Sequence, residues 1–234
     1  MLNDLFSERA LEQALTVLKN ELPLAIWETF YVTLLSTFFA VVLGLPLGVL
    51  LVAGEKNGVL PLPRWLMTLL NGVINLLRSI PFLILMIMVI PLSRLLVGTS
   101  IGTVATIVPL VVAAFPFVAR LAETSLREVD HGVIEAAQSM GASPLQIIVK
   151  VMLPESVPSL LSNLTTALTT VLGYSAMSGV IGGGGLGKIA IDYGYYRFQY
   201  LVMLIAVVLL VVLVQLFQTL GTRIAASCDK RRRQ

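Results

Sequence analysis

Residues 135–154 read EAAQSMGASPLQIIVKVMLP, the longest stretch away from the chain ends that does not fit comfortably inside a lipid bilayer. Asp130 is placed to cap a short helix that carries Glu135, because a side-chain oxygen at such a position accepts hydrogen bonds from free backbone amides. Gly141 can adopt the left-handed conformation that commonly ends a helix. We therefore expect a short polar helix that ends near Gly141.

A second short helix is predicted directly after the first. Ser143 is a good N-cap, and Pro144 has the backbone angle of a first helical turn. Pro154 has no N–H to donate to the preceding turn, so we expect the second helix to end before it. The sequence thus predicts two short helices at an angle, within a polar loop of about residues 122–156. Its charges of both signs suit a protein partner.

The rest of the chain has the composition of a membrane protein. Hydrophobic residues make up 57% and charged residues 12% of the 234 residues, and the mean hydropathy is +0.92. Soluble domains carry about 25% charged residues. The chain has room for about five spans and none for a nucleotide-binding domain. Its single Cys228 rules out a disulfide within the chain, nothing suggests a metal site, and a net charge of +3 is no argument for nucleic acid.

Five apolar stretches are candidate spans of an all-α membrane protein. They lie at about residues 27–53, 66–92, 101–121, 157–180 and 201–220. Pro109 and Pro116 interrupt the third, so we expect it inside the bundle, where neighbours or water satisfy the freed carbonyls. Gly44 and Gly48 in the first favour close packing or a bend.

Residues 1–25 are predicted to form an amphipathic helix that lies on the membrane surface. A cleavable signal begins with basic residues, whereas this segment begins with acidic ones. Leucines recur in it at helical spacing: Leu11, Leu15, Leu18 and Leu22.

The distribution of Lys and Arg predicts the orientation. With the N-terminus outside and the C-terminus in the cytoplasm, ten of them lie on the cytoplasmic side and five outside, leaving out Arg78 within a span. This excess agrees with the positive-inside rule. The basic tail, with Lys230 and its three following arginines, reads as ordinary anchoring to anionic lipid.

Arg78 stands in the segment Arg78-Ser79-Ile80-Pro81 of the second span. An ionisable residue at membrane depth is costly and faces either the bundle interior or the interface. Two interpretations stay open for Arg78, namely a role in gating and a structural role in which it reaches toward lipid phosphates.

The fourth span has the most informative periodicity in the chain. Small or hydroxyl side chains share one helix face: Ser159, Ser162, Thr166, Thr169 and Gly173. Such a stripe serves either interhelical packing or a polar path through the membrane.

A glycine run at residues 182–188, GGGGLGK, nearly matches a phosphate-binding loop. Ile189 stands where that loop needs a hydroxyl for magnesium, and no strand precedes the glycines, so we reject this interpretation. We expect a flexible extracytoplasmic turn instead. Four tyrosines follow as an interfacial aromatic belt: Tyr193, Tyr195, Tyr196 and Tyr200.

Three other functions compete with these motifs, namely an intramembrane enzyme, a passive channel and a structural membrane subunit. An intramembrane enzyme needs a base near its nucleophile, but the only histidine, His131, lies in the polar loop, and no Asp or Glu lies deep in a predicted span. A passive channel or a structural membrane subunit stays open, since a hydroxyl-lined helix would also suit a pore.

The polar loop resembles the EAA loop of bacterial ABC importer permeases, the membrane subunits driven by a separate ATPase. The likeness rests on Glu135-Ala136-Ala137, on Gly141 six residues after Glu135, and on Leu153-Pro154; Val151 departs, since family members often have Ile there. In that family the loop is a cytoplasmic coupling helix that seats in a groove of the ATPase. The resemblance implies these ATPase-coupling residues: Glu135, Ala136, Ala137, Gly141, Ala142, Leu153 and Pro154.

Further segments resemble the methionine-uptake subfamily over about residues 25–225. They are residues 78–81, 97–102, 173–177, 185–187 and 193–195. The acidic start is longer than in that subfamily and leaves open an extra surface contact. The resemblance implies the type I importer permease fold for residues 26–225, between the amphipathic segment and a basic cytoplasmic tail at residues 226–234.

The same resemblance implies partners and mechanism. The complex would hold two copies of this chain, two ATPase subunits that carry ATP and magnesium, and an extracytoplasmic methionine-binding lipoprotein, in a bacterial inner membrane. Transport would follow alternating access, with no cofactor, metal or nucleic acid on this chain. The candidate path or gate residues are Arg78, Ser162, Thr166, Thr169, Gly173, Tyr174, Ser175 and Met177. A permease for another amino acid stays the alternative, because the binding protein largely sets specificity.

Overall fold

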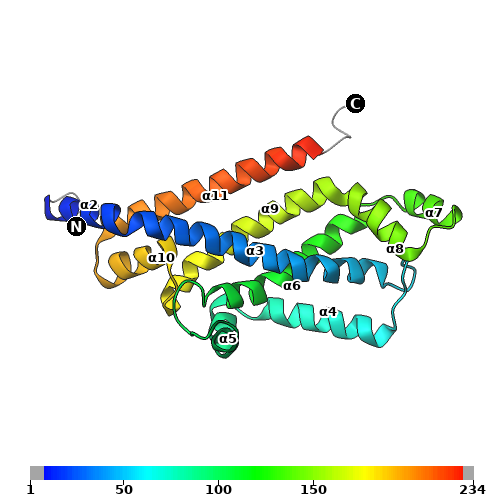
Figure 1. Cartoon of the computed structure of the whole chain (residues 1–234), viewed down its shortest axis with the longest axis horizontal. Coiled ribbons are helices and arrows are strands. Elements are labelled where there is room, and N and C mark those ends of the chain that lie inside the picture. The colour runs from blue at the N-terminus through cyan, green and yellow to red at the C-terminus, as the bar shows by residue number, and fades with distance from the viewer. Residues whose placement is uncertain (1–7, 229–234) are drawn as a thin grey trace. The chain divides into compact units, whose positions relative to one another are not determined.

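The computed structural model describes residues 8–228, and its regular elements in that range are all helical (Figure 1). The basic residues Lys230 to Arg233 lie outside the described residues. The chain forms two compact units. The first holds the described residues up to Thr37, with Pro81–Val112 and Leu168–Phe217; the second holds Phe38–Ile80, Ala113–Ala167 and the described residues from Gln218 on.

Within the described residues, four helices are long and apolar enough to cross a membrane, and a fifth candidate is a bent pair. The four are α3 (Leu22–Ala53), α6 (Ile107–Arg127), the run Pro144–Ile181 that contains α9 (Leu153–Met177), and α11 (Tyr200–Cys228). Each contributes residues to both units. The prediction of an all-α membrane protein with about five spans is therefore confirmed as four to five candidate spans.

In the second unit, two glycines bring α3 and α6 into backbone contact. A Cβ atom on Gly44 would lie 2.6 Å from the carbonyl oxygen of Phe115, and one on Gly48 would lie 2.6 Å from that of Ala119. Of the two expectations for these glycines, close packing is the one the structure shows. Pro46, between them, is accommodated inside α3.

The predicted second span at residues 66–92 is wrong as a single helix. The chain instead forms α4 (Arg64–Ser79) and α5 (Phe82–Val97) and bends by 111° at the break. Ile80 is extended, with φ −78° and ψ 128°. A proline disfavours the helical conformation of the residue before it, so Pro81 ends α4 at Ser79 and begins α5.

The predicted third span at residues 101–121 begins and ends too early. α6 starts at Ile107, because Gly102, with φ 104°, and the hydroxyl turn of Thr103 and Thr106 precede it. Pro109 therefore lies in the first turn, where its missing N–H costs nothing, and only Pro116 is inside the helix. At the other end α6 runs on through charged residues to Arg127.

The prediction that Pro154 ends a helix is also wrong. α8 (Pro144–Ile147) continues through a π-helical segment, Ile148–Met152, directly into α9. A π-helical turn bonds each amide to the carbonyl five residues back, so the ladder is re-spaced just before the proline whose N–H is missing. Only the first of the two predicted short helices, α7 (His131–Ser139), is separate and short.

The N-terminal segment forms α2 (Glu8–Asn20), whose backbone bonds run on into α3, from Glu21 N–H to Val17 and from Ala25 N–H to Glu21. Of the four predicted stripe leucines, Leu11 and Leu15 are exposed, whereas Leu18 packs against a core of the first unit and Leu22 belongs to it. Ala14 and Val17 are buried in the same core. That core also contains Leu22, Ala25, Leu186, Ile189, Val202 and Ala206.

The predicted glycine-rich turn holds only for residues 182–184, because a helix begins at Gly185, and the segment is closely packed. A 3-10 turn at Ser178–Ile181 leads to α10 (Gly185–Ile189) and a π-helical segment, Ala190–Tyr196. The tyrosines follow: the Tyr193 hydroxyl donates to the Glu21 carboxylate, which raises the pKa of Tyr193. The last helix then extends eight residues beyond its predicted end near residue 220.

Candidate functional site

Hydrogen bonds at both ends set the shape of α7. The Asp130 carboxylate accepts a hydrogen bond of 2.6 Å from Gly132 N–H, as a capping residue should. At the other end Gly141 has φ 77°, and its N–H donates to Gln138 while that of Ala142 donates to Ala137. This is the left-handed ending expected from the sequence, and both predicted caps of α7 are confirmed.

Ser143 caps α8 in the predicted way and adds a reciprocal bond. Its hydroxyl accepts from Gln146 N–H at 3.4 Å, and the Gln146 side chain accepts from Ser143 N–H at 2.9 Å. Pro144 occupies the first helical position. Two amides at the start of α8 are thereby satisfied without any contact outside the loop.

The exposed residues of α7, α8 and the turn after them include polar ones, such as Gln138 and Gln146, as well as one acidic and several apolar ones. We call the acidic and apolar set the α7–α8 surface, and it consists of Val133, Glu135, Ala136, Met140, Gly141, Leu145 and Val149. Met140 is 81% exposed and Leu145 70%. Single apolar side chains on a surface are ordinary, but a cluster rimmed by charge is typical of a protein interaction site.

The inner side of the same helices rests on a buried core in the second unit. Ala137, Ile147, Ile148 and Met152 pack against Ala53 at the end of α3 and Leu126 near the end of α6. Of the residues assigned to coupling, Ala137 therefore faces inward, and Glu135, Ala136 and Gly141 face outward. The α7–α8 surface is packed on the ends of two long helices, so a displacement of this surface is transmitted to α3 and α6.

An ion-pair network stabilises the C-terminal end of α6. Glu123 accepts from Arg120 at 2.6 Å and from Arg127 at 2.8 Å, and Arg127 also reaches Glu55 at 2.6 Å. Arg120 further donates to Asn71 at 2.8 Å on α4. Glu123 is 13% exposed and lies near the end of α6, so it is not deep in a candidate span.

A cavity of about 380 Å³ opens between this network and α7. Glu55, Arg127, His131, Glu135 and Gln138 line it, with apolar residues of the core at its base. It joins polar groups of both signs to the side chain of Glu135. The sequence pattern indicated that charges of both signs in this loop suit a protein partner, and the structure brings Arg127 and Glu135 to one cavity.

The hydroxyl stripe of α9 divides between packing and an open face. Ser159 donates to Ser125 of α6 at 3.2 Å, and Asn163 donates to the same hydroxyl at 2.8 Å. Ser162 and Thr166 are exposed, as is Gly173, around which a Cβ atom would meet no other atom within 4 Å. The structure shows the packing role at Ser159, and the polar path along Ser162, Thr166 and Gly173 stays a prediction.

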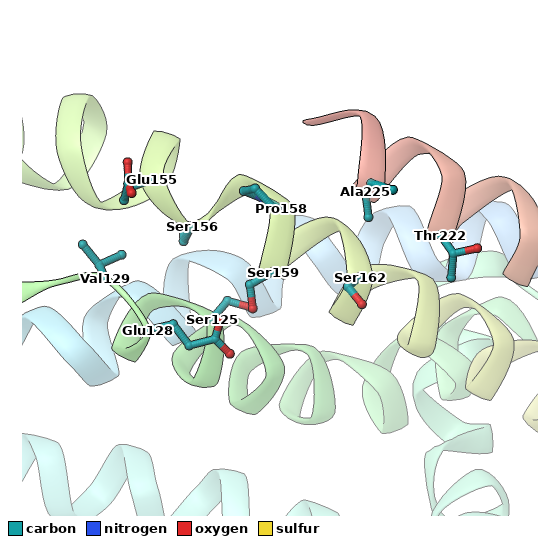
Figure 2. A pocket seen from close by; sticks show the side chains of 11 residues that line it. Ser125, Glu128, Val129, Glu155, Ser156, Pro158, Ser159, Ser162, Thr222 and Ala225 are labelled. Atoms are coloured by element: carbon teal, nitrogen blue, oxygen red, sulfur yellow. The ribbon is translucent and has the colours of Figure 1, made fainter. Parts of the chain in front are cut away.

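Ser159 and Ser162 also line a cavity of about 420 Å³ in the second unit (Figure 2). Ser125 and Glu128 at the end of α6 and Thr222 on α11 complete its polar wall. The figure shows side-chain oxygens of α6 and α9 close together on one side and Thr222 and Ala225 of α11 on another. The cavity can hold a small polar molecule or ordered water.

The predicted gate residues lie at the end of α9 in the first unit. The Tyr174 ring stacks on Phe82 of α5 with centroids 4.3 Å apart. Ser175 is buried and donates to the Leu172 carbonyl at 2.7 Å, whereas Met177 is 48% exposed. Arg78, in the second unit, is exposed in the last turn of α4. The structure therefore brings Tyr174, Ser175 and Met177 together on one helix end.

Sequence reasoning missed the groups that hold the glycine-rich segment. Glu28 of α3 accepts hydrogen bonds from the Thr103 hydroxyl and from Gly185 N–H at the start of α10. Its neighbour Thr29 accepts one from Leu186 N–H. The signal available was a single carboxylate in an otherwise uncharged run of 32 residues in α3. Its partners could not be found from spacing.

Comparison with known proteins gives a family. Residues 40–233 match the model of the binding-protein-dependent transport system inner membrane component. The chain belongs to this family. It is therefore the membrane-embedded, non-catalytic permease component of an ABC transport system, located in the inner membrane with several spans.

Relatives place the permease more closely. The chain is 50% identical over 210 residues to the "Probable D-methionine transport system permease protein MetI" of Vibrio cholerae serotype O1, covering 88% of this chain and 92% of the relative. It is 47% identical over 154 residues to the D-methionine transport system permease protein MetI of Escherichia coli K12, covering 66% and 70%.

A solved structure agrees with the similarity to methionine permeases. A chain of the MetNI methionine ABC transporter in inward facing conformations is 46% identical, with a TM-score of 0.87, and the match covers 89% of this chain and 96% of that one. The resemblance to methionine-uptake permeases that the sequence motifs suggested is confirmed.

Proposed function

We propose that this chain is the permease subunit of an ATP-driven importer that takes up methionine, in its L and D forms, across the cytoplasmic membrane. Relatives with 50% and 47% identity carry the description of D-methionine permeases, and the 46% identical solved chain belongs to a methionine transporter. The likeness extends over most of each chain, so it supports a shared transport role rather than a shared local motif.

The observation that carries the proposal is the α7–α8 surface on its buried core. Glu135 and Ala136 lie outward, and Ala137 with Ile147 fixes the same helices to the ends of α3 and α6. This surface seats in a groove of the ATPase. Glu135 anchors the contact, and Ala136 with Gly141 lets the two backbones approach closely.

The full importer contains two copies of this permease, two ATPase subunits and an extracytoplasmic methionine-binding lipoprotein. ATP and magnesium bind the ATPase, and residues 182–188 of the permease lack the hydroxyl that a phosphate loop needs. The excess of Lys and Arg near α7 and the end of α11 supports a cytoplasmic position for the α7–α8 surface. The gate residues Tyr174 and Met177 then lie toward the outside.

Transport follows alternating access. Closure of the ATPase dimer moves the α7–α8 surface, and the long helices attached to it open the outer side to accept methionine from the binding protein. The open face of α9, with Ser162, Thr166 and Gly173, lines the path where two copies of the permease meet. This face carries no charged group, so the binding protein supplies most of the selectivity.

Uptake in cells tests the substrate. We expect cells that lack their own methionine importers to accumulate labelled L-methionine when they express this chain with its cognate ATPase and binding protein, and unlabelled D-methionine to compete. Competition by a different amino acid in place of methionine would correct the substrate and keep the permease. Flux that needs no ATP would contradict an importer and indicate a channel.

Gly141→Asp tests the coupling surface with a matched control. Gly141 and Gly98 both end helices with positive φ, 77° and 81°, and neither has atoms within 4 Å of an added Cβ. The left-handed strain is therefore similar, about 1–2 kcal/mol. We expect Gly141→Asp to abolish uptake while the protein stays in the membrane, and Gly98→Asp to retain most of it. Equal loss in both would show backbone strain rather than coupling.

A further inference from the structure

Glu28 is an acidic residue in the second turn of α3, at the start of a long apolar helix. One carboxylate oxygen accepts from the Thr103 hydroxyl at 2.7 Å, and the other accepts from Gly185 N–H at 2.8 Å. A partly buried carboxylate is stable when its oxygens receive donors, and here each oxygen has one. The residues that Glu28 joins are far apart in the chain.

The next residue of α3 continues the same pattern. The Thr29 hydroxyl accepts from Leu186 N–H at 2.8 Å and donates to Ala25 at 2.9 Å. Gly185 and Leu186 are the first residues of α10, whose amides have no partner within their own helix. Two consecutive side chains of α3 therefore cap two consecutive amides of α10.

Glycines make this contact possible. A Cβ atom on Gly184 would lie 2.1 Å from the Thr103 hydroxyl and 2.5 Å from a Glu28 carboxylate oxygen. On Gly185, which has φ 81°, it would lie 2.5 Å from the Thr29 hydroxyl. The glycine run that resembled a phosphate loop thus receives a carboxylate and a hydroxyl from its own chain.

The capped helix α10 is in backbone contact with the predicted gate. A Cβ atom on Gly187 of α10 would lie 2.1 Å from the Ala176 carbonyl oxygen, so the two backbones touch. Gly179 meets Lys188 in the same way, at 2.6 Å from its nitrogen. Ala176 lies between Tyr174 and Met177 at the end of α9. A change in the position of α10 must therefore move these gate residues.

We propose that Glu28, Thr29 and Thr103 form a latch that holds α10 against the end of α9 and so keeps the outer gate closed. Glu28 is a positioning residue, since it acts on Tyr174 and Met177 through α10. This inference rests on the proposed permease function and on its orientation. The latch acts through hydrogen bonds rather than charge, because both Glu28 oxygens are directed at donors within the protein.

Replacement of Glu28 by glutamine separates hydrogen bonding from charge. In Glu28→Gln the side-chain carbonyl can accept from Gly185 N–H, and the NH₂ group can donate to Thr103, whose hydroxyl turns from donor to acceptor. Glu28→Gln therefore keeps both contacts, whereas Glu28→Leu keeps neither. Glu12→Leu is the control, because Glu12 is an exposed acidic residue on α2 of the same unit.

The test measures how readily the gate opens. In a Cys228→Ser background, Met177→Cys is labelled from outside the cell with a membrane-impermeant thiol reagent. We expect Glu28→Leu to raise the labelling rate about tenfold, as the loss of two side-chain hydrogen bonds predicts. Glu28→Gln and Glu12→Leu stay within about twofold. An unchanged rate in Glu28→Leu, or an equal rise in Glu28→Gln, would overturn the latch.

Two further measurements keep the result independent of folding and of substrate. Thr29→Val preserves shape and removes the acceptor for Leu186 N–H together with the hydroxyl's bond to the Ala25 carbonyl within α3. It tests the latch if Glu28→Leu does not fold, and no rise in labelling would count against the latch. Hydrogen–deuterium exchange of residues 182–190 in the purified complex should speed up in both variants. Faster exchange without faster labelling would overturn the gating role. Absence of methionine uptake in the unmodified importer would instead contradict the proposed function.

Discussion

Asp130, Gly141 and Ser143 fix the α7–α8 surface through bonds that reach no more than a few residues along the chain. Each side-chain cap contributes about 1 kcal/mol. Because cap chemistry is local, the sequence predicted all three residues and the structure confirms them. The same cannot be said of side chains with distant partners.

Glu28 shows why side chains with distant partners could not be predicted from the sequence. Its carboxylate bonds to residues 75 and 157 positions away. No spacing rule connects such positions, so only the fold reveals that the carboxylate, the hydroxyls and the glycines belong together. The charges of α6 are similar: the sequence showed them, but the fold shows that Glu123 is shared by Arg120 and Arg127.

The ion-pair network gives a prediction at this scale. Glu123 is 13% exposed and has two arginine partners, whereas Glu55 is 45% exposed and has one. We expect Glu123→Ala to lower the free energy of unfolding by about 1–3 kcal/mol, since two guanidinium groups lose a shared acceptor. Glu55→Ala should cost less than about 1 kcal/mol. Thermal unfolding of the purified permease in detergent measures both; a larger cost for Glu55→Ala would contradict the network.

At the scale of elements, the periodicity of apolar residues predicted the helices, but three helix boundaries predicted from prolines were wrong. Pro81 broke a predicted span, Pro109 proved to be a first-turn residue, and Pro154 was passed by a π-helical segment. A proline at a helix start, in a kink or beside a π-helical turn has the same local sequence. Packing decides among these outcomes, as it does for Ile147 just before the π-helical segment and Met152 at its end.

The α3–α6 contact gives a prediction that compares two glycines. A Cβ on Gly48 would lie 2.6 Å from the Ala119 oxygen, whereas Gly72 on α4 has nothing within 4 Å. We expect Gly48→Ala to cost about 1–3 kcal/mol of unfolding free energy, because the helices must separate. Gly72→Ala should be neutral or stabilise by up to about 1 kcal/mol. Equal effects on the unfolding midpoint would refute the close contact.

The π-helical segment gives another prediction at this scale. Deleting Lys150 removes the extra residue of the turn and converts Ile148–Met152 to a regular helix, which rotates α8 by about 100° relative to α9. We expect uptake to be lost while the permease still folds, because the buried core no longer supports the α7–α8 surface in its present direction. Lys150→Ala, which keeps the length, should transport normally. Normal uptake by the deletion variant would show that this direction does not matter.

At the scale of the whole molecule, each unit holds its own chemistry. The second unit carries the α7–α8 surface, its cavity and the arginine–glutamate network. The first carries the capped α10 and the predicted gate at Tyr174 to Met177. Composition was enough to predict a helical membrane protein, and sequence motifs were enough to indicate its family. The packing that links each motif to its neighbours came from the fold alone.

Contact with the ATPase tests the central claim most directly. Met140 and Leu95 are almost equally exposed, at 81% and 80%, but only Met140 belongs to the α7–α8 surface. In a Cys228→Ser background, a photoreactive maleimide on Met140→Cys should crosslink to the ATPase subunit in membranes, and the same probe on Leu95→Cys should not. No crosslink from Met140→Cys in an importer that still transports methionine would contradict coupling through α7 and α8.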